Sequence, residues 1–196
     1  MNLREVLKRD YVQTFVMIIA AIVAVLIFWY GLSFVMGTGN PILAVASESM
    51  EPVLYKGDLI LIEGIQNPAD IYAAYADEDP QGDILVFHKP IGVDELIVHR
   101  AVEKIDNGDG TYSFKTKGDN NPGRDGWTVE ESHIVGRYLG KIPWVGNIAL
   151  LFAETEVKIA FIVLWVVILL IVELAPTIKR KVKGGDDVEA SLYKSL

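Results

Sequence analysis

The side chains able to do chemistry are few in this chain, and the clearest are hydroxyl and imidazole groups. Two serines lie close together in residues 47–52 (SESMEP), and the chain has 3 histidines, His88, His99 and His133. A serine hydroxyl attacks a substrate when a neighbouring base removes its proton. Histidine suits that task because it ordinarily titrates near neutral pH. We therefore consider an activated serine first.

An activated serine also needs a carboxylate that holds the imidazole in the right tautomer. Asp119 and Asp125 stand at either end of a turn-forming segment, GDNNPGRD, that covers residues 118–125. Ser49, His99 and Asp125 therefore form a hypothetical catalytic triad. Spacing alone does not decide the matter, because a domain of this size contains these residue types by chance. From the residues alone, ordinary roles in caps, strands and turns are the more common explanation.

Other chemistries fit the sequence poorly. The chain has no cysteine, which excludes disulfides, a thiol nucleophile and a Cys-ligated metal. The histidines form no H-x-x-x-H or H-x-H pair that would place two metal ligands on one face. Residues 106–110 (DNGDG) resemble a calcium loop, but their glycines stand at the wrong positions for an EF-hand. We predict a tight hairpin turn there, and we expect neither a metal nor a cofactor.

Apolar and charged residues are unevenly distributed along the chain. Its 196 residues suffice for about one folded unit. The 18 Lys and Arg against 26 Asp and Glu disfavour binding to nucleic acid, which requires a basic surface. The mean hydropathy of +0.31 is high for a small soluble domain, because apolar residues gather in two runs.

The first apolar run, residues 11–36, contains no charged side chain. A helix of about 20 apolar residues crosses a bilayer, so we predict a transmembrane helix there. A buried core helix is rarely this long and this apolar on every side. A cleaved signal peptide is the other alternative, with Ala44-Val45-Ala46 as its cleavage site. Its apolar region would typically be about 7–15 residues long, so we predict a retained anchor.

The second apolar run, residues 159–172, is shorter and is followed by a basic cluster at residues 179–183. We predict a second transmembrane helix over residues 157–176 and a cytoplasmic basic tail over residues 177–196. The alternative is an amphipathic or core helix that packs on the folded domain.

The charge distribution predicts an orientation in the cell membrane. Basic residues concentrate on the cytoplasmic side of transmembrane helices. They are frequent in residues 1–10 and after the second run, whereas acidic residues outnumber basic ones about twofold in between. We therefore expect both termini in the cytoplasm. We expect the domain over residues 37–150 on the outer face.

That middle domain has the pattern of a β structure. Short runs rich in β-branched and alternating residues are separated by Gly-Asp and Asn-Gly turns, which favours an all-β sheet or barrel. The predicted strands cover residues 59–64, 84–90, 95–105, 112–117 and 134–139. Residues 67–81 are polar and predict a surface insertion or a short helix.

Several short motifs occur in an order that resembles signal peptidase I. They are residues 47–52, 56–58 (KGD), 82–84 (GDI), 98–100 (VHR) and 117–121 (KGDNN) followed by Asp125. The set covers roughly residues 43–140, after an apolar run in the expected place. His99 stands where common bacterial members carry a lysine, and this is similar to the archaeal and endoplasmic-reticulum branch. Glu48 stands where glycine is common, and we expect its side chain to point to solvent.

The resemblance implies a role for each residue. Ser49 would be the nucleophile and His99 the general base. Asp125 would orient the imidazole, and Asp119 would be a second carboxylate nearby. Because Asp119 directly follows Gly118 at the expected end of a strand, we predict that its side chain bonds to backbone N–H groups of the turn. The Ser47 hydroxyl and the Ser49 backbone N–H would form the oxyanion hole.

The resemblance also implies a fold and a substrate. The fold would be mainly β, a catalytic domain between an N-terminal and a C-terminal transmembrane helix. The substrates would be secreted preproteins, whose signal peptides end in a small-x-small pattern and bind as an added strand. Association with the secretion machinery and contact with membrane lipid would follow. Met50 and Trp144 suit either lipid contact or ordinary core packing.

Two other interpretations of the same chain stay open. One is a related serine protease that cuts itself or a regulator, although such proteins are typically soluble and use lysine. The other is a membrane-anchored β domain without catalysis.

Overall fold

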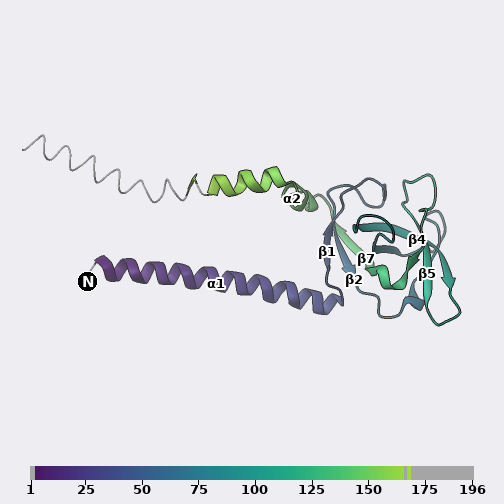
Figure 1. The fold of residues 1–196 in the computed structure, drawn as a ribbon, viewed down its shortest axis with the longest axis horizontal. Coiled ribbons are helices and arrows are strands. Elements are labelled where there is room, and N and C mark those ends of the chain that lie inside the picture. Colours follow the sequence, from purple (N-terminus) through teal and green to yellow (C-terminus); the bar gives the residue numbers. More distant parts are fainter. Residues whose placement is uncertain (1–2, 166, 169–196) are drawn as a thin grey trace, which may run out of the picture. The chain divides into compact units, whose positions relative to one another are not determined.

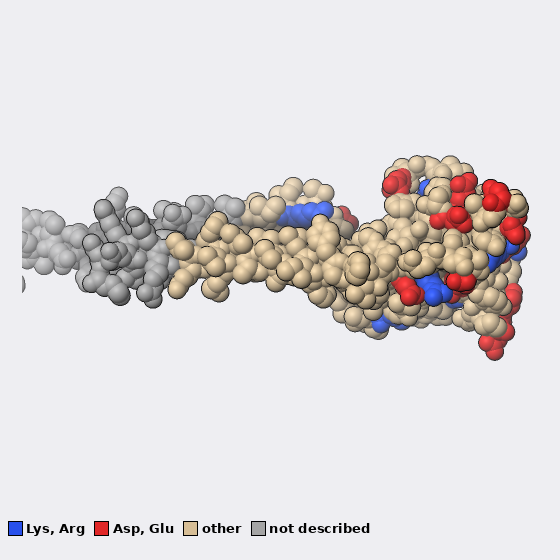
Figure 2. Space-filling model, turned by 90° about the horizontal axis from the view of Figure 1, so that it is seen from below, with Lys and Arg blue, Asp and Glu red and all other residues tan. Residues whose placement is uncertain are grey.

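The computed structural model describes residues 3–165, 167 and 168, and begins with one long helix, α1 (Leu3–Met36). Residues 15–36 of α1 are long and apolar enough to cross a membrane, and none of that stretch is buried in the protein. On the face seen in Figure 2, charged side chains gather on the domain that follows, whereas α1 carries none after residue 10. The predicted N-terminal apolar helix is confirmed.

The helix ends in a tight backbone motif. Gly37 adopts a φ of 66°, a left-handed conformation that glycine accepts without strain. The N–H groups of Gly37 and Thr38 donate to the carbonyls of Phe34 and Ser33, which satisfies two carbonyls of the last turn. The Thr38 hydroxyl then donates to the Val135 carbonyl at 3.0 Å, so the end of α1 is joined to the domain.

The domain is built on a seven-stranded antiparallel sheet, which confirms the mainly β prediction (Figure 1). The strand order is β1-β2-β7-β3-β4-β5-β6. The strands are β1 (Ile42–Ala44), β2 (Leu59–Glu63), β3 (Ile84–His88), β4 (Leu96–Asp106), β5 (Tyr112–Lys117), β6 (Val129–Glu130) and β7 (Ile134–Ile142). The domain also contains two 3-10 turns, Pro68–Asp70 and Glu131–His133, and a short helix α2 (Gly146–Leu151) follows β7.

The segment that resembles a calcium loop is a hairpin turn, as its glycines predict. β4 ends at Asp106 and β5 begins at Tyr112, and the two strands are paired antiparallel. The Asn107 N–H donates to the Thr111 carbonyl at 3.1 Å and closes the turn.

The hydrophobic core lies on both faces of the sheet, because β3 at its centre is buried on both sides. Successive side chains of a strand point to opposite faces. Leu85 and Phe87 accordingly pack in one cluster, and Ile84 and Val86 in the other. Met50 joins the second of these clusters with 1% of its surface exposed, so it packs in the core and does not contact lipid.

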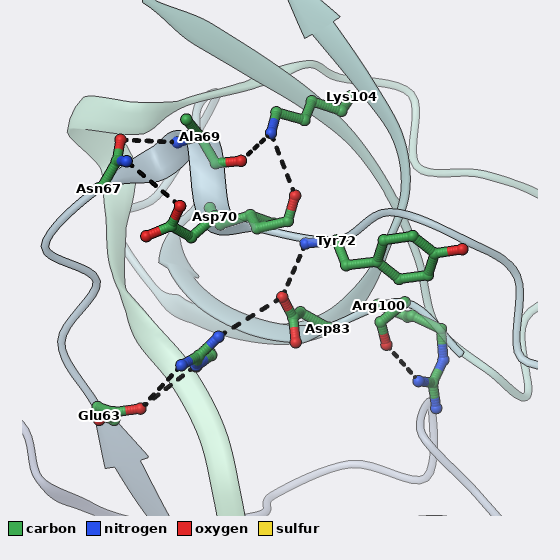
Figure 3. Close-up of polar contacts among 11 residues, drawn as sticks. Glu63, Asn67, Ala69, Asp70, Tyr72, Asp83, Arg100 and Lys104 are labelled. Atoms are coloured by element: carbon green, nitrogen blue, oxygen red, sulfur yellow. Dashed lines mark hydrogen bonds and ion pairs between the residues drawn. The ribbon is translucent and has the colours of Figure 1, made fainter. Parts of the chain in front are cut away.

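The polar insertion between β2 and β3 is fixed on the sheet by hydrogen bonds rather than by a long helix (Figure 3). Lys104 on β4 reaches across and donates to the carbonyls of Ala69 and Ile71. The Tyr72 N–H donates to the Asp83 carboxylate at 2.8 Å. The insertion is therefore held in a defined position at Asp83, directly before β3.

The second predicted transmembrane helix lies partly outside the described residues. Residues 155–165, 167 and 168 are helical, in a compact unit that begins at Ile148. Among the residues that the structure describes, only the 15–36 stretch passes the length and hydropathy criteria for a span. The span over residues 157–176 therefore stays a prediction.

Candidate active site

The candidate nucleophile, Ser49, lies in the turn after β1, and the segment that follows β5 forms hydrogen bonds to the backbone of this turn. The Asn120 N–H donates to the Ser49 carbonyl at 2.9 Å, and the Asn120 side chain donates to the Glu48 carbonyl at 3.1 Å. Gly118 permits this close approach, because a Cβ there would lie 2.6 Å from the Ser49 carbonyl oxygen. The backbone of Ser49 is thus fixed by neighbours distant in sequence.

Ser49, His99 and Asp125 form one row of hydrogen bonds. The Ser49 Oγ lies 3.1 Å from His99 Nε2, and His99 Nδ1 lies 2.6 Å from Asp125 Oδ2. An ionised carboxylate can only accept, so Nδ1 carries the proton and leaves the Nε2 lone pair facing the serine. The side chains of His99 and Asp125 are 9% and 6% exposed, which keeps water away from the pair.

The other two histidines lie away from this row. His88 is the last residue of β3, and its Nδ1 is 2.7 Å from Asp94 Oδ1 on the surface. His133 Nδ1 is 3.4 Å from the hydroxyl of its neighbour Ser132. Of the three histidines, the structure therefore brings only His99 to the serine.

Thr116 is a site residue that the sequence motifs did not single out. Its hydroxyl donates to Asp125 Oδ2 at 2.6 Å, and its carbonyl accepts from the Asp125 N–H at 2.9 Å. Thr116 is completely buried near the end of β5. A threonine at a core-facing position of a strand, directly before the acidic turn, is the signal that could have found it.

Asp119 does not contact His99, and it binds a different partner from the one expected. Its two carboxylate oxygens accept from Arg100 Nε and Nη2 at 2.9 and 2.6 Å, and Arg100 Nη1 donates to the Gly82 carbonyl at 2.6 Å. The expectation that Asp119 would bind backbone N–H groups of its turn is wrong. The reason is that Arg100 is buried beside His99, and a buried guanidinium needs a charge partner. The planar fork of arginine matches a carboxylate in two places.

Ser47 lies beside the candidate nucleophile. The two hydroxyl oxygens of Ser47 and Ser49 are 3.2 Å apart, and Ser47 is exposed. A hydroxyl at this position can turn its hydrogen toward a group that binds over Ser49.

The row of hydrogen bonds opens into an apolar groove of about 430 Å³. It runs between β1 and the first part of β4. β1 is an edge strand that pairs only with β2 among the described strands, and β4 pairs with β5 only from Arg100 onward. The groove is lined by Leu43, Ala44, Val45, Ala46, Ser47, Ser49, Met50, Glu95, Leu96, Ile97, Val98, His99 and Asn121.

An ion pair supports residues 47–54, the segment that carries Ser49 and is called the serine turn below. Lys141 Nζ donates to Asp58 Oδ2 at 2.9 Å and to the Val53 carbonyl at 2.8 Å, and the Tyr55 N–H donates to the same carboxylate at 3.0 Å. Burial alone would raise the pKa of Asp58, but the bonds from Tyr55 and Lys141 outweigh it, so its pKa lies below the usual value. Within the described part of the chain, no cluster of three potential ligands could hold a metal ion.

Comparison with known proteins identifies relatives of the chain. No protein-family model matches it. The chain is 34% identical over 166 residues to the signal peptidase complex catalytic subunit SEC11C of Canis lupus familiaris, covering 78% of each chain. It is 32% identical to the SEC11 catalytic subunit of Lachancea thermotolerans, over 80% of this chain and 89% of the relative. It is 31% identical to the sec11 subunit of Dictyostelium discoideum, over 75% of this chain and 80% of the relative.

Proposed function

The chain belongs to the signal peptidase family of serine endopeptidases, and on this premise we propose that it removes signal peptides from secreted preproteins. The observation that carries the proposal is the row of hydrogen bonds from Ser49 through His99 to Asp125. The row lies in a groove that suits an extended, apolar peptide.

In the proposed reaction, His99 Nε2 takes the proton of Ser49 as the serine oxygen attacks the carbonyl carbon of the scissile bond. Asp125 accepts from Nδ1 throughout and stabilises the imidazolium that forms. The carbonyl oxygen becomes an anion and is stabilised by the Ser49 N–H and the Ser47 hydroxyl. The imidazolium then gives its proton to the leaving amine, and water, activated in turn by His99, hydrolyses the acyl-enzyme.

The signal peptide would bind in the groove as an additional strand. The unpaired edges of β1 and β4 offer backbone hydrogen bonds, and side-chain pockets between them select residues at alternate positions. The groove wall consists mainly of aliphatic side chains, which favours small apolar residues. A small-x-small pattern before the scissile bond fits that requirement.

The long apolar helix supports a place in the cell membrane. A signal peptide is itself held in the bilayer, so a membrane-anchored enzyme meets it at a high effective concentration. We propose a second span over residues 157–176, both termini in the cytoplasm and the catalytic domain on the outer face. Because relatives are named as subunits of a signal peptidase complex, we also propose association with other components of the secretion machinery.

The test is cleavage by the full-length protein in detergent. A purified preprotein with a known signal peptide is incubated with the wild type and with Ser49→Ala, and the cut is mapped by mass spectrometry. We expect one cut after a small-x-small pattern and none with the variant. Autolysis without cleavage of the preprotein would favour a self-processing protease. No cleavage of either would favour a domain without catalysis.

A further inference from the structure

The peptide group between Glu48 and Ser49 carries the backbone N–H that the proposed reaction uses to stabilise the oxyanion. Among the described residues, this N–H has no hydrogen-bond acceptor, so it is free to donate to a substrate. The N–H and the carbonyl of one trans peptide group are coplanar and point in opposite directions. A contact that holds the Glu48 carbonyl therefore also sets the direction of the Ser49 N–H.

Two donors hold the Glu48 carbonyl. The Glu51 N–H donates to it from within the serine turn at 3.2 Å, and the Asn120 side chain donates to it from the segment after β5 at 3.1 Å. A carbonyl oxygen has two lone pairs and can accept both bonds. The Glu48 side chain is exposed, as expected for an acid beside the nucleophile, so its carbonyl is the group that is fixed. The Asn120 bond thus ties this peptide group to a second part of the domain.

The amide of Asn120 is presented from a well-anchored segment. Its own backbone N–H donates to the Ser49 carbonyl at 2.9 Å, so Asn120 contacts two consecutive carbonyls of the serine turn. The preceding residue, Asp119, accepts two hydrogen bonds from the buried Arg100 on β4. Gly118 allows the two segments to approach, because a Cβ there would lie 2.6 Å from the Ser49 carbonyl oxygen. The position of the Asn120 amide is therefore fixed relative to β4, the strand that carries the catalytic base.

A donor on the carbonyl oxygen also changes the strength of the N–H in the same peptide group. Hydrogen bonds that share a polar group polarise one another, so a bonded carbonyl makes its N–H a better donor. An oxyanion hole acts on charge that develops in the transition state. An interaction that is stronger in the transition state than in the bound substrate raises kcat.

We propose that the Asn120 side chain is a positioning residue for the oxyanion hole. By holding the Glu48 carbonyl, it aims the Ser49 N–H at the substrate oxygen that becomes charged and strengthens that N–H as a donor. The proposal rests on the signal-peptide-removing function proposed above. Asn120 is not among the residues that line the groove, so its replacement should affect the reaction of the bound peptide rather than its binding.

The first experiment measures kcat and KM for one preprotein with the full-length protein in detergent. Asn120→Ala removes the bond to the Glu48 carbonyl and keeps the backbone bond to the Ser49 carbonyl. Loss of one neutral hydrogen bond should lower kcat about 3- to 10-fold, with KM changed by less than about twofold. Asn120→Asp keeps the shape but replaces the donor with an acceptor, and it should lower kcat at least as much. The control is Asn67→Ala in the polar insertion, whose side chain bonds locally outside the groove, and it should keep the wild-type kcat.

The second experiment compares two forms of one peptide that ends in Ala-Leu-Ala, a C-terminal aldehyde and the corresponding alcohol. The aldehyde adds to Ser49, because its carbon bonds to the serine oxygen and its own oxygen, which takes the serine proton, lies at the oxyanion hole. The alcohol binds in the groove without reacting. The ratio of the two affinities is internal to one protein, so a change in the groove that affects both peptides leaves it unaltered. We expect the ratio to fall about 3- to 10-fold in both Asn120 variants and to stay constant in Asn67→Ala.

Three results would overturn the inference. They are a wild-type kcat and affinity ratio in both Asn120 variants, an equal loss of affinity for aldehyde and alcohol with a raised KM, and a wild-type kcat in Asn120→Asp beside a lowered one in Asn120→Ala. The last would mean that the shape of the side chain matters and its donor does not. Absence of preprotein cleavage by the wild type would instead count against the proposed function. The affinity ratio would still test Asn120 in that case, because it requires no cleavage.

Discussion

At the scale of single residues, two serines whose hydroxyls lie 3.2 Å apart are expected to behave very differently when replaced. Ser49→Ala removes the attacking oxygen and should lower the rate about 10⁴-fold or more. Ser47→Ala removes only a hydrogen-bond donor and should cost about 10²–10³-fold in kcat. Single-turnover cleavage of one preprotein measures both. Near-normal cleavage by Ser49→Ala would refute the assignment of the nucleophile.

The three histidines offer a second comparison. His99→Ala should abolish cleavage, because no other histidine lies beside Ser49. His88→Ala and His133→Ala should retain most of the activity, since both side chains bond only to surface neighbours. Activity of the wild type should fall at acid pH, because a protonated imidazole cannot accept the serine proton. Loss of cleavage in either surface variant with survival of His99→Ala would reverse this assignment.

Replacement of Asp125 is expected to lower the reaction rate, whereas replacement of Asp119 is expected to lower the stability. Asp125→Asn leaves the imidazole in the wrong tautomer and should lower the rate about 10⁴-fold while the protein stays folded. Asp119→Asn breaks a pair with Arg100 in which both side chains are at most 4% exposed. Removing one partner of a buried pair typically costs about 3–5 kcal/mol of stability. Thermal melts and turnover of both variants separate the two roles.

One outcome would contradict the assignment of Asp125 as the orienting carboxylate. A folded Asp125→Asn with nearly full rate, beside a folded but inactive Asp119→Asn, would make Asp119 the orienting acid. Thr116→Val serves as a milder probe, because it removes one hydrogen bond from Asp125 and leaves the carboxylate in place.

At the scale of elements, the longer strands could be predicted from the sequence and the short edge strands could not. Alternation and Gly-Asp turns predicted β2, β3, β4, β5 and β7 closely. The edge strands β1 and β6 have 3 and 2 residues, too few to show a period.

The groove and the hydrogen-bond partners of the site residues could not be predicted either, because both depend on contacts between segments far apart in the sequence. β1 and β4 are far apart in sequence, and their approach depends on how the whole sheet folds. The partner of Asp119 is likewise a residue that only the fold brings near. The motifs indicated the residue types Ser, His and Asp, but their distances exist only in three dimensions.

The link between β7 and the serine turn makes stability depend on pH. The lowered pKa of Asp58 means that the folded protein favours the ionised carboxylate. Its contribution is complete above the ordinary value of 3.8 and is lost as the pH falls through the lowered pKa. Asp58→Asn should therefore be less stable by about 1–3 kcal/mol at pH 7. The gap in Tm between wild type and variant should narrow in melts recorded from pH 7 to pH 3. A gap that does not change with pH would contradict the role of the Asp58 charge.

At the scale of the whole molecule, charge is segregated along the chain. Residues 11–36 carry no charge, and the domain after them is acidic. Basic residues before the helix favour a cytoplasmic N-terminus. An enzyme that cuts preproteins after export needs its catalytic domain on the outer face of the membrane. A cytoplasmic N-terminus followed by one transmembrane helix places the domain on that face.

The last prediction concerns this orientation and the second span. With both termini in the cytoplasm, protease added outside intact spheroplasts should spare an epitope tag at either end. It should digest a site placed in the exposed loop at residues 77–80.

Basic residues at 179–183 would retain the C-terminus inside after residues 157–176 cross the bilayer. Replacing those basic residues with glutamine is the matched change, and it should allow a fraction of the C-terminal tag to be digested. Digestion of the C-terminal tag in the unaltered protein would mean that residues 157–176 do not cross the membrane, and protection of both tags after lysis would invalidate the assay.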